Sequence, residues 1–557
     1  MNYLKSFATV HPLDGINEDR LGKCQSLLAG RWIDDVNYFD DIVDPITGKP
    51  FLDVPKTEDI SGFISNLDQC PKSGLHNPLK NNDRYIMLGD VCSKAAQILR
   101  DEEVETFFTL LIQRVMPKTY NQCLGEVRVT RTFLENFAGD GVRFLGRGFS
   151  NPGDYTGQES SGYRWPFGSV VIITPFNFPL EIPALQFLGA LFMGNRPLVK
   201  PDEKVGVVFE QFLRLLIYCG LPSQDSDLIY CNGSTMAQLI KQGKEKIRMI
   251  QFTGSSDVAH QIIHEMDGKV KIEDAGFDWK IIGPDYDPKW SDYVAWQCDE
   301  DAYNASGQKC SAQSILFIHE NWQDDLLPKL KTLAERRNLS NLSIGPILTW
   351  NNKQLFNHIN QLLAIPNSQC LFGNESLENH SIPLNYGAIK PTAILVPIEQ
   401  LMTEYFDLIT SEVFGPIQVV ISYNLDTLPI VLKGLEHIPH NLSAAVVSND
   451  VHFQQRIFTY NDISLSAGLQ DIVFQNKQSD EQILSLDTDL LSFFLVLASE
   501  KDLGDYKMST FMGFGTGGLG PMDSVKVISD SIKTTNAGVF VGFLLKTPYF
   551  GRTGGMD

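Results

Sequence analysis

The chain has 557 residues, which is too long for one ordinary hydrophobic core, so we expect two large lobes or more. Apolar residues make up 43% and charged residues 20%, the proportions of a soluble globular protein. The 46 basic and 67 acidic residues give a formal net charge of −21, which repels phosphates and therefore disfavours nucleic acid and anionic membranes as partners.

Residues 84–148 are predicted to form amphipathic helices, and Asp101–Val115 carries an apolar face at helical spacing. From Ser169 onward the pattern changes to alternating strands and helices. The expected strands are 170–173, 197–200, 227–230, 248–253 and 269–273, and the expected helices are 179–194, 205–219, 235–242 and 256–266. This alternation predicts a parallel sheet covered on both faces, the architecture of a nucleotide-binding lobe with its ligand at the carboxyl ends of the strands.

A second mixed region extends over 293–469 and includes the strand-like segment Tyr293–Trp296. The remainder, 470–557, has a different composition, and its fold is not predicted. Its glycine cluster, Gly513–Gly520, superficially matches a dinucleotide-binding pattern, but no clear strand precedes it. We therefore expect a phosphate site there in only roughly one case in twenty.

The cysteines and the termini indicate the compartment. The nine cysteines are scattered, and none forms a CxxC pair with suitably placed histidines, so neither a metal site nor a disulfide framework is indicated. A reducing compartment fits this pattern. The apolar run 490–498 is much shorter than the ~20 residues of a membrane-spanning helix. Residues 1–15 are too few and too acidic for a targeting presequence.

Ser306–Ala312 (Ser-Gly-Gln-Lys-Cys-Ser-Ala) holds the sharpest candidate for catalysis. Cys310 follows the strand-like Tyr293–Trp296 and precedes the apolar Ile315–Phe317, a position that suits an exposed nucleophile. Since the thiolate is the form that attacks carbonyls, such a residue needs a polar, partly open setting. A lone cysteine is simply a core residue in roughly nine cases in ten, so the assignment depends on the neighbouring motifs.

Three other segments complete a constellation. Asn177 lies just past a predicted strand, where its amide can donate to a developing oxyanion, although in isolation an ordinary turn asparagine is roughly as common. Glu273 lies at another strand end, but a Glu-Asp pair is a solvated loop in roughly four cases in five. Phe252–Ser256 opens a helix whose N–H groups can hold a pyrophosphate, or it is an ordinary helix cap.

Together these segments resemble the aldehyde dehydrogenase superfamily, in that family's order, and most closely its plant-type Δ1-pyrroline-5-carboxylate dehydrogenase branch. The similarity covers about residues 7–469. The segments that carry it are Tyr-Arg-Trp-Pro-Phe-Gly at 163–168, Thr-Pro-Phe-Asn-Phe-Pro-Leu-Glu-Ile-Pro at 174–183, Ile-Glu-Asp-Ala-Gly-Phe-Asp-Trp-Lys at 272–280 and Gly-Gln-Lys-Cys-Ser-Ala-Gln-Ser at 307–314.

The resemblance implies an α/β fold with a doubly wound nucleotide-binding lobe, an α/β catalytic lobe and a bridging oligomerisation hairpin, and thus a homo-oligomer. The implied boundaries are 1–147 and 166–290 for the NAD-binding domain, 148–165 for the hairpin, 291–469 for the catalytic domain and 470–557 for a divergent C-terminal region. Kinship also suggests the mitochondrial matrix, with the cytoplasm as the alternative.

By resemblance, Cys310 is the nucleophile, Glu273 is the general base for deacylation, and Asn177 forms the oxyanion hole with the backbone N–H of Cys310. The implied mechanism is covalent: a thiohemiacetal forms, hydride passes to NAD, and a water activated by Glu273 hydrolyses the resulting thioester. Ser311 matches a substrate contact. No metal is implied.

The cofactor contacts are carried over in the same way. Lys200 and Glu203 match the adenosine-ribose contacts, and a glutamate there favours NAD because it accepts hydrogen bonds from free ribose hydroxyls and repels the phosphate of NADP. Glu412 and Phe414 match the residues that hold the nicotinamide ribose and ring. The remaining matches to cofactor contacts are Thr174, Pro175, Phe176, Gly233, Gly254, Ser255 and Val258.

Three positions depart from the family pattern. The usual Glu-Leu-Gly-Gly reads Glu-Asp-Ala-Gly at 273–276, and Asp274 is expected to point to the opposite face of the strand from Glu273. Ala259 stands where a second glycine of the phosphate turn is common. After residues 467–469, neither the aldehyde-anchoring loop nor the strand that joins the partner subunit's sheet is recognisable.

The expected reaction is the NAD-dependent oxidation of L-glutamate 5-semialdehyde, or Δ1-pyrroline-5-carboxylate, to L-glutamate in proline catabolism. Because the anchor loop is not recognisable, a dehydrogenase for another semialdehyde is one alternative. A catalytically weak binding or structural protein is another. Retention of Cys310, Glu273, Asn177, Lys200 and Glu412 together argues against that last alternative.

Overall fold

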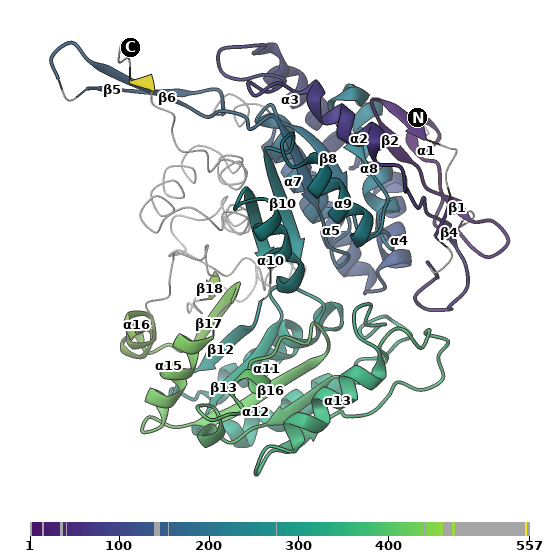
Figure 1. Cartoon of the computed structure of the whole chain (residues 1–557). Coiled ribbons are helices and arrows are strands. Elements are labelled where there is room, and N and C mark those ends of the chain that lie inside the picture. The colour runs from purple at the N-terminus through teal and green to yellow at the C-terminus, as the bar shows by residue number, and fades with distance from the viewer. Residues whose placement is uncertain are drawn as a thin grey trace.

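The protein forms two α/β lobes, each built on a seven-stranded sheet, and a hairpin that projects from the first lobe (Figure 1). Within the part of the chain that is described, no helix is long and apolar enough to cross a membrane. The computed structural model describes residues 3–13, 16–33, 37–39, 42–138, 145–153, 155–274, 276–438, 441–460, 471–473 and 552–553.

The first sheet has the strand order β11-β10-β7-β8-β9-β2-β3, with β7 to β11 parallel and β2 and β3 antiparallel at one edge. Its central strand β7 is apolar on both faces, because Val170 and Ile172 pack into one hydrophobic cluster and Val171 into another. Such a strand is stable only under helices on both sides. The strands are β2 (Ser26–Leu28), β3 (Arg31–Ile33), β7 (Ser169–Ile173), β8 (Arg196–Lys200), β9 (Asp227–Leu228), β10 (Met249–Gly254) and β11 (Val270–Asp274).

Helices cover both faces of this sheet, as the sequence predicts. The face of Val170 packs against α3 (Asp83–Ile98), α4 (Glu102–Val115), α5 (Tyr120–Asn136), α7 (Glu181–Phe192) and α8 (Val207–Tyr218). The face of Val171 packs against α2 (Ser61–Asn66), α9 (Gly233–Gly243) and α10 (Ser256–Glu265). The alternating strands and helices expected from 169 to 274 are confirmed, as is the amphipathic helix expected at 101–115, which Asp101 caps by accepting from the backbone N–H of Glu103 and Val104.

The second sheet has the order β14-β15-β16-β13-β12-β17-β18, parallel except for β14 at the edge. Its strands are β12 (Asp278–Ile282), β13 (Gln313–His319), β14 (Gln369–Phe372), β15 (Thr392–Leu395), β16 (Ile417–Tyr423), β17 (Ser443–Val447) and β18 (Asp471–Val473). Its helices are α11 (Pro288–Tyr303), α12 (Glu320–Glu335), α13 (Asn352–Leu363), α14 (Phe406–Ile409), α15 (Leu428–His437) and α16 (Val451–Tyr460).

Two expectations from the sequence are wrong in this region. Tyr293–Trp296 is not a strand but the middle of α11, which Asp287 caps and in which Val294, Cys298 and Ala302 recur at helical spacing and are buried. The strand β12, assigned above to the NAD-binding domain, pairs instead with β13 and β17 of the second sheet. We therefore propose that the domain boundary lies before residue 278 rather than at 290.

The projecting hairpin consists of β5 (Gly148–Pro152) and β6 (Glu159–Tyr163), which pair antiparallel within the predicted 148–165. The short strand β19 (Arg552–Thr553) pairs with β6 (Figure 1). The hairpin therefore has a C-terminal strand beside it, which the sequence did not reveal. The glycine cluster 513–520 lies outside the described residues. Shorter elements of the first lobe are α1 (Leu4–Phe7) and the paired strands β1 (Gly22–Lys23) and β4 (Leu52–Asp53).

Candidate active site

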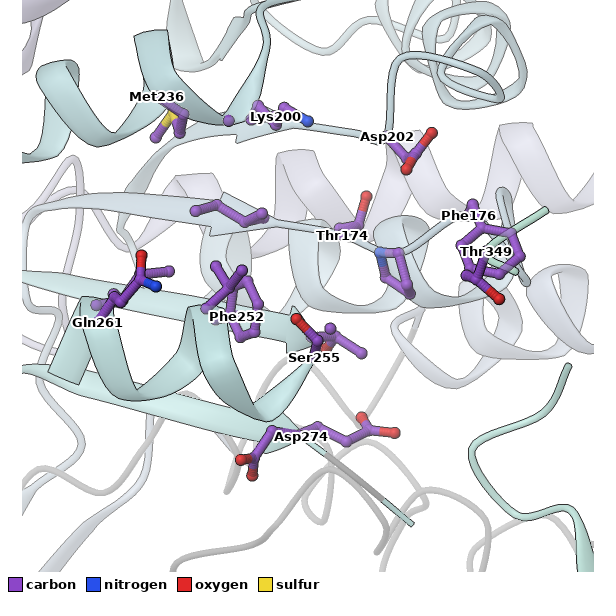
Figure 2. Close-up of a pocket in the computed structure, with 18 of the residues that line it drawn as sticks. Thr174, Phe176, Lys200, Asp202, Met236, Phe252, Ser255, Gln261, Asp274 and Thr349 are labelled. Atoms are coloured by element: carbon purple, nitrogen blue, oxygen red, sulfur yellow. The ribbon is translucent and has the colours of Figure 1, made fainter. Parts of the chain in front are cut away.

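A cavity of about 940 Å³ lies where the carboxyl ends of β7, β8, β10 and β11 meet loops of the second lobe. In the close-up of Figure 2, Lys200 and Asp202 lie along one side of it, and Phe252, Ser255 and Asp274 lie along the other. The cavity is thus at the position that a doubly wound sheet provides for a nucleotide. Predicted site residues that line it are Thr174, Pro175, Phe176, Asn177, Lys200, Gly233, Gly254, Ser255, Val258, Glu273, Cys310, Glu412 and Phe414.

Cys310 reaches the cavity on a loop between α11 and β13. Ala305, Ser306 and Gly307 all take left-handed backbone angles there, with φ of 49°, 60° and 70°. Glycine is required at 307, because a methyl group would lie 2.2 Å from the carbonyl oxygen of Gly415. Gln308 then anchors the loop, since its Nε2 donates to the carbonyl of Pro346 at 3.0 Å and its Oε1 accepts from the N–H of Leu348 at 2.8 Å.

The thiol of Cys310 and the carboxyl of Glu273 lie beside each other at the cavity. Burial raises the pKa of the Cys310 thiol well above its ordinary value, and the negative charge of Glu273 raises it further. Burial also raises the pKa of Glu273, while its interaction with the thiol opposes that rise. A basic carboxylate in contact with a thiol is the arrangement in which the thiol can give up its proton on demand.

Asn177 follows β7 in a tight turn, and its side chain is only 2% exposed. Its Nδ2 donates one hydrogen bond to the carbonyl of Gln308 at 3.1 Å, which ties the amide to the loop of Cys310. A side-chain amide carries two N–H donors, so one donor is available beside the nucleophile. The Oδ1 atom is buried without a hydrogen-bond partner in the described structure.

Lys200 and Glu203 meet at the far end of the cavity, with 2.7 Å between Nζ and Oε2. Burial by itself lowers the pKa of Lys200, but the charges of Glu203 and Asp202 and the hydrogen bond to Glu203 together raise that pKa, so the lysine is protonated. Lys200 lines the cavity. Glu203 is not among the lining residues and is connected to the cavity by its ion pair with Lys200. The pair presents a cation and a carboxylate together, which suits a vicinal diol.

The phosphate end of the cavity is formed by β10 and α10. Ser255 precedes the helix without a side-chain cap bond, so it leaves the first-turn N–H groups of α10 available to an anion. Val258, 42% exposed, lines the cavity from the same turn. Thr174 adds a buried hydroxyl that has no hydrogen-bond partner among the described residues. Helix N–H groups, a free hydroxyl and the Lys200–Glu203 pair are a donor and acceptor set that fits a dinucleotide.

Glu412 and Phe414 close the cavity from the second lobe. One carboxylate oxygen of Glu412 accepts from the N–H of Gly276 at 3.2 Å, and burial raises the pKa of Glu412. Phe414 has a left-handed backbone, with φ of 52°, and its ring meets that of Phe176 edge to face at 5.9 Å. These contacts hold both residues across from Cys310.

Some placements differ from the expectations. Asp274 also lines the cavity, but Glu273 is the carboxylate that reaches Cys310. Ser311 does not line the cavity, and its hydroxyl is buried without a partner. The sequence did not predict several lining residues, because they come from loops and helix faces without a motif. These are Asp202, Met236, Gln261, Thr349 and Trp350.

The described residues contain no group of three or more His, Cys, Asp or Glu side chains able to hold a metal ion. None of the nine cysteines is in a disulfide. Cys310, Glu273 and Asn177 bring a thiol, a carboxyl and an amide to the cavity.

The aldehyde dehydrogenase family model matches residues 86–464, and the chain belongs to that family. It is an enzyme of the aldehyde dehydrogenase type, with the α/β fold expected from its sequence. It is 51% identical over 463 residues to a mitochondrial Δ1-pyrroline-5-carboxylate dehydrogenase of Arabidopsis thaliana, a match that covers 82% of each chain. It is 50% identical over 455 residues to a probable aldehyde dehydrogenase of Linum usitatissimum, which covers 81% of this chain and 82% of the relative.

A solved NAD-dependent aldehyde dehydrogenase from Sinorhizobium meliloti has the same fold, with a TM-score of 0.69 at 18% identity, covering 81% of this chain and 87% of that one. The similarity to the Δ1-pyrroline-5-carboxylate dehydrogenase branch, expected from the motifs, is therefore confirmed by the 51% identity.

Proposed function

We propose that this enzyme oxidises L-glutamate 5-semialdehyde, the open form of Δ1-pyrroline-5-carboxylate, to L-glutamate with NAD as the oxidant. The observation that supports the reaction class is the placement of the Cys310 thiol beside the Glu273 carboxyl at the cavity, with the amide of Asn177 tied to the same loop. The identity to the Arabidopsis enzyme supports the choice of substrate.

Cys310 is the nucleophile. Its proton passes to Glu273, and the thiolate sulfur then forms a bond to the aldehyde carbon while the carbonyl electron pair moves to oxygen. The second N–H of Asn177 and the backbone N–H of Cys310 stabilise that oxygen, and removing one such donor lowers kcat by about 10²–10³-fold in other enzymes.

Glu273 serves as the general base in the second half of the reaction. After the proton taken from Cys310 has passed to solvent, Glu273 takes a proton from a water that attacks the acyl carbon, and the carbon–sulfur bond then breaks and the thiolate leaves. A carboxylate whose pKa is raised by burial is a stronger base than one in water. Burial raises the pKa of Glu273, and Glu273 lies near Cys310, so it suits this role.

The cofactor site is proposed on the residues that line the cavity away from Cys310. Lys200 and Glu203 hold the adenosine ribose, the N-terminus of α10 with Gly254 and Ser255 holds the pyrophosphate, and Glu412 and Phe414 hold the nicotinamide end. When bound, NAD accepts the hydride from the substrate carbon. The carboxylate of Glu203 favours NAD over NADP, because it would face the additional phosphate of NADP.

Residues Pro175, Phe176 and Gly233 complete the proposed cofactor contacts, since they line the same cavity.

We further propose a homo-oligomer assembled through the hairpin of β5 and β6, and a location in the mitochondrial matrix. The name of the Arabidopsis relative supports the location. A dehydrogenase for another semialdehyde remains the second candidate, because the segment expected to carry the aldehyde anchor lies outside the described residues.

The test is NADH formation from Δ1-pyrroline-5-carboxylate by the wild type and by Cys310→Ala. Turnover by the wild type alone supports the substrate, the cofactor and the nucleophile. Activity on simpler aldehydes only would refute the substrate, and silence with every aldehyde despite NAD binding would refute the catalytic proposal. Binding is measured separately as thermal stabilisation by NAD, which amounts to about 2.7 kcal/mol at 100 times the dissociation constant.

A further inference from the structure

An ion pair is buried directly behind the turn that carries Asn177. Lys118, just before α5, and Glu126, within α5, meet with 2.7 Å between Nζ and Oε2, and their side chains are 1% and 0% exposed. Burial by itself lowers the pKa of Lys118, but the charge of Glu126, its hydrogen bond to the lysine and the nearby Cys123 and Glu181 together raise that pKa, so the lysine carries its proton. The pair does not line the cavity, and the reaction as described above does not use it.

Both members of the pair bind the backbone of residues 177–181. Lys118 Nζ donates to the carbonyl oxygen of Asn177 at 3.1 Å and lies 4.2 Å from the ring centre of Phe178. Glu126 Oε1 accepts from the N–H groups of Leu180 at 2.7 Å and of Glu181 at 3.1 Å. Lys118 therefore fixes the start of the turn, and Glu126 fixes its end.

Capping the first N–H groups of α7 would require only an uncharged acceptor, such as a serine or asparagine side chain. Burying two charges is unfavourable unless the geometry is exact enough to recover their desolvation. A helix cap does not need the second contact, in which the cation of Lys118 binds the carbonyl oxygen of Asn177. That contact sets the direction of the peptide from which the Asn177 side chain extends toward Gln308 and Cys310.

We propose that Lys118 and Glu126 are positioning residues that clamp the turn 177–181 and thereby hold the amide of Asn177 in place to donate to the oxyanion. This inference rests on the role proposed for Asn177. Catalytic groups must be held within a fraction of an ångström, and a misplacement of about 1 Å can lower a rate by about 10²-fold. The clamp therefore acts on kcat through Asn177, without touching substrate or cofactor.

The test is a double-mutant cycle between the clamp and Asn177. Removing one charge would leave the other uncompensated in the interior, so the clamp variant is Lys118→Met with Glu126→Gln, which keeps an oxygen acceptor for the two N–H groups. It is made in the wild type and in Asn177→Ala. The same aldehyde, one that the wild type oxidises, is used throughout, and kcat is divided by the folded fraction from circular dichroism.

A matched control comes from the same lobe. Arg196 and Asp227 form a comparably buried pair, 3% and 0% exposed, at the end of β8 away from Lys200. The control variant, Arg196→Met with Asp227→Asn, removes the same two charges without approaching the turn. It is expected to lower the melting temperature and to keep kcat per folded molecule within about twofold of the wild type.

The expected result is a loss of kcat of roughly tenfold or more for the clamp variant, with the KM for NAD unchanged. In the Asn177→Ala background the same two changes are expected to alter kcat by less than about twofold. An equal loss in both backgrounds, or an equal loss in the control, would overturn the clamp but leave the role of Asn177 intact. Full activity of Asn177→Ala alone would refute that role, and the clamp with it.

If the clamp variant does not fold, Lys118→Arg decides the question. It keeps the charge, but its longer side chain displaces the cation from the carbonyl of Asn177. A loss of kcat that disappears in the Asn177→Ala background supports the clamp, and wild-type kcat per folded molecule refutes it.

Discussion

Gly276 provides a direct test of how closely the active site is packed. Its N–H donates to Glu412, and a methyl group on its α-carbon would lie 2.2 Å from the carbonyl oxygen of Cys310. Non-bonded carbon–oxygen contacts are about 3.3 Å or longer, so in Gly276→Ala the loop of Cys310 must retreat by about 1 Å. A shift of that size in a nucleophile is expected to lower kcat/KM by about 100-fold.

The assay is NADH formation under saturating cofactor, with the melting temperature measured beside it. Overpacking of this kind destabilises by about 1–3 kcal/mol, so Gly276→Ala should still be folded at 25 °C. Gly243→Ala in α9 is the control, because its added methyl would meet only side-chain atoms, of Leu67 at 3.3 Å and of Ile247 at 3.4 Å. A kcat/KM for Gly276→Ala within about threefold of the wild type would show that the loop has room to spare, and the packing argument would be wrong.

Further predictions concern three single carboxylates. Glu273→Gln should slow the first turnover of NADH at neutral pH and lower the steady-state rate by about 10²–10⁴-fold, as seen by stopped flow, since Cys310 loses its proton acceptor and deacylation loses its base; an unchanged steady state would exclude that role. In the same variant the first-turnover rate should rise at a lower pH than in the wild type, because the charge of Glu273 raises the pKa of Cys310. Burial raises the pKa of Glu181 to about 8 in the folded protein, so its contribution to stability is lost as the pH rises from about 5 to 8. The free energy of unfolding of Glu181→Gln should therefore exceed that of the wild type by up to about 5 kcal/mol at pH 8, and should not exceed it at pH 4.5. Glu203→Gln should raise kcat/KM with NADP relative to NAD by about tenfold, which is about 1.4 kcal/mol; an unchanged ratio would mean that Glu203 does not select the cofactor.

Local pattern was sufficient for the nucleotide-binding lobe. Val170, Val171 and Ile172 are consecutive apolar residues in a short run, and only a strand buried on both faces accommodates them, as the two separate hydrophobic clusters demonstrate. The motifs around Cys310, Asn177 and Glu273 were equally visible, because each lies at a strand end or loop whose residues are contiguous.

Other features depended on contacts between distant segments. Tyr293–Trp296 is aromatic and β-branched, which favours a strand, but the cap at Asp287 and the packing of α11 decide for a helix. The strand β12 follows β11 by only a few residues, yet it crosses to the other sheet because its partners are β13 and β17. No pattern within a window of ten or twenty residues contains those partners.

By itself, the sequence determined the family, the parallel-sheet architecture and the candidates for the reactive groups, because these are written in short-range periodicity and contiguous motifs. Only the tertiary structure decided that the thiol of Cys310 lies beside Glu273 and that Lys118 and Glu126 contact the backbone of the turn of Asn177. The physical reason is that such contacts join residues far apart in the chain. Their distances follow from how two lobes and several helices pack, and the free energy of that packing is a property of the whole fold.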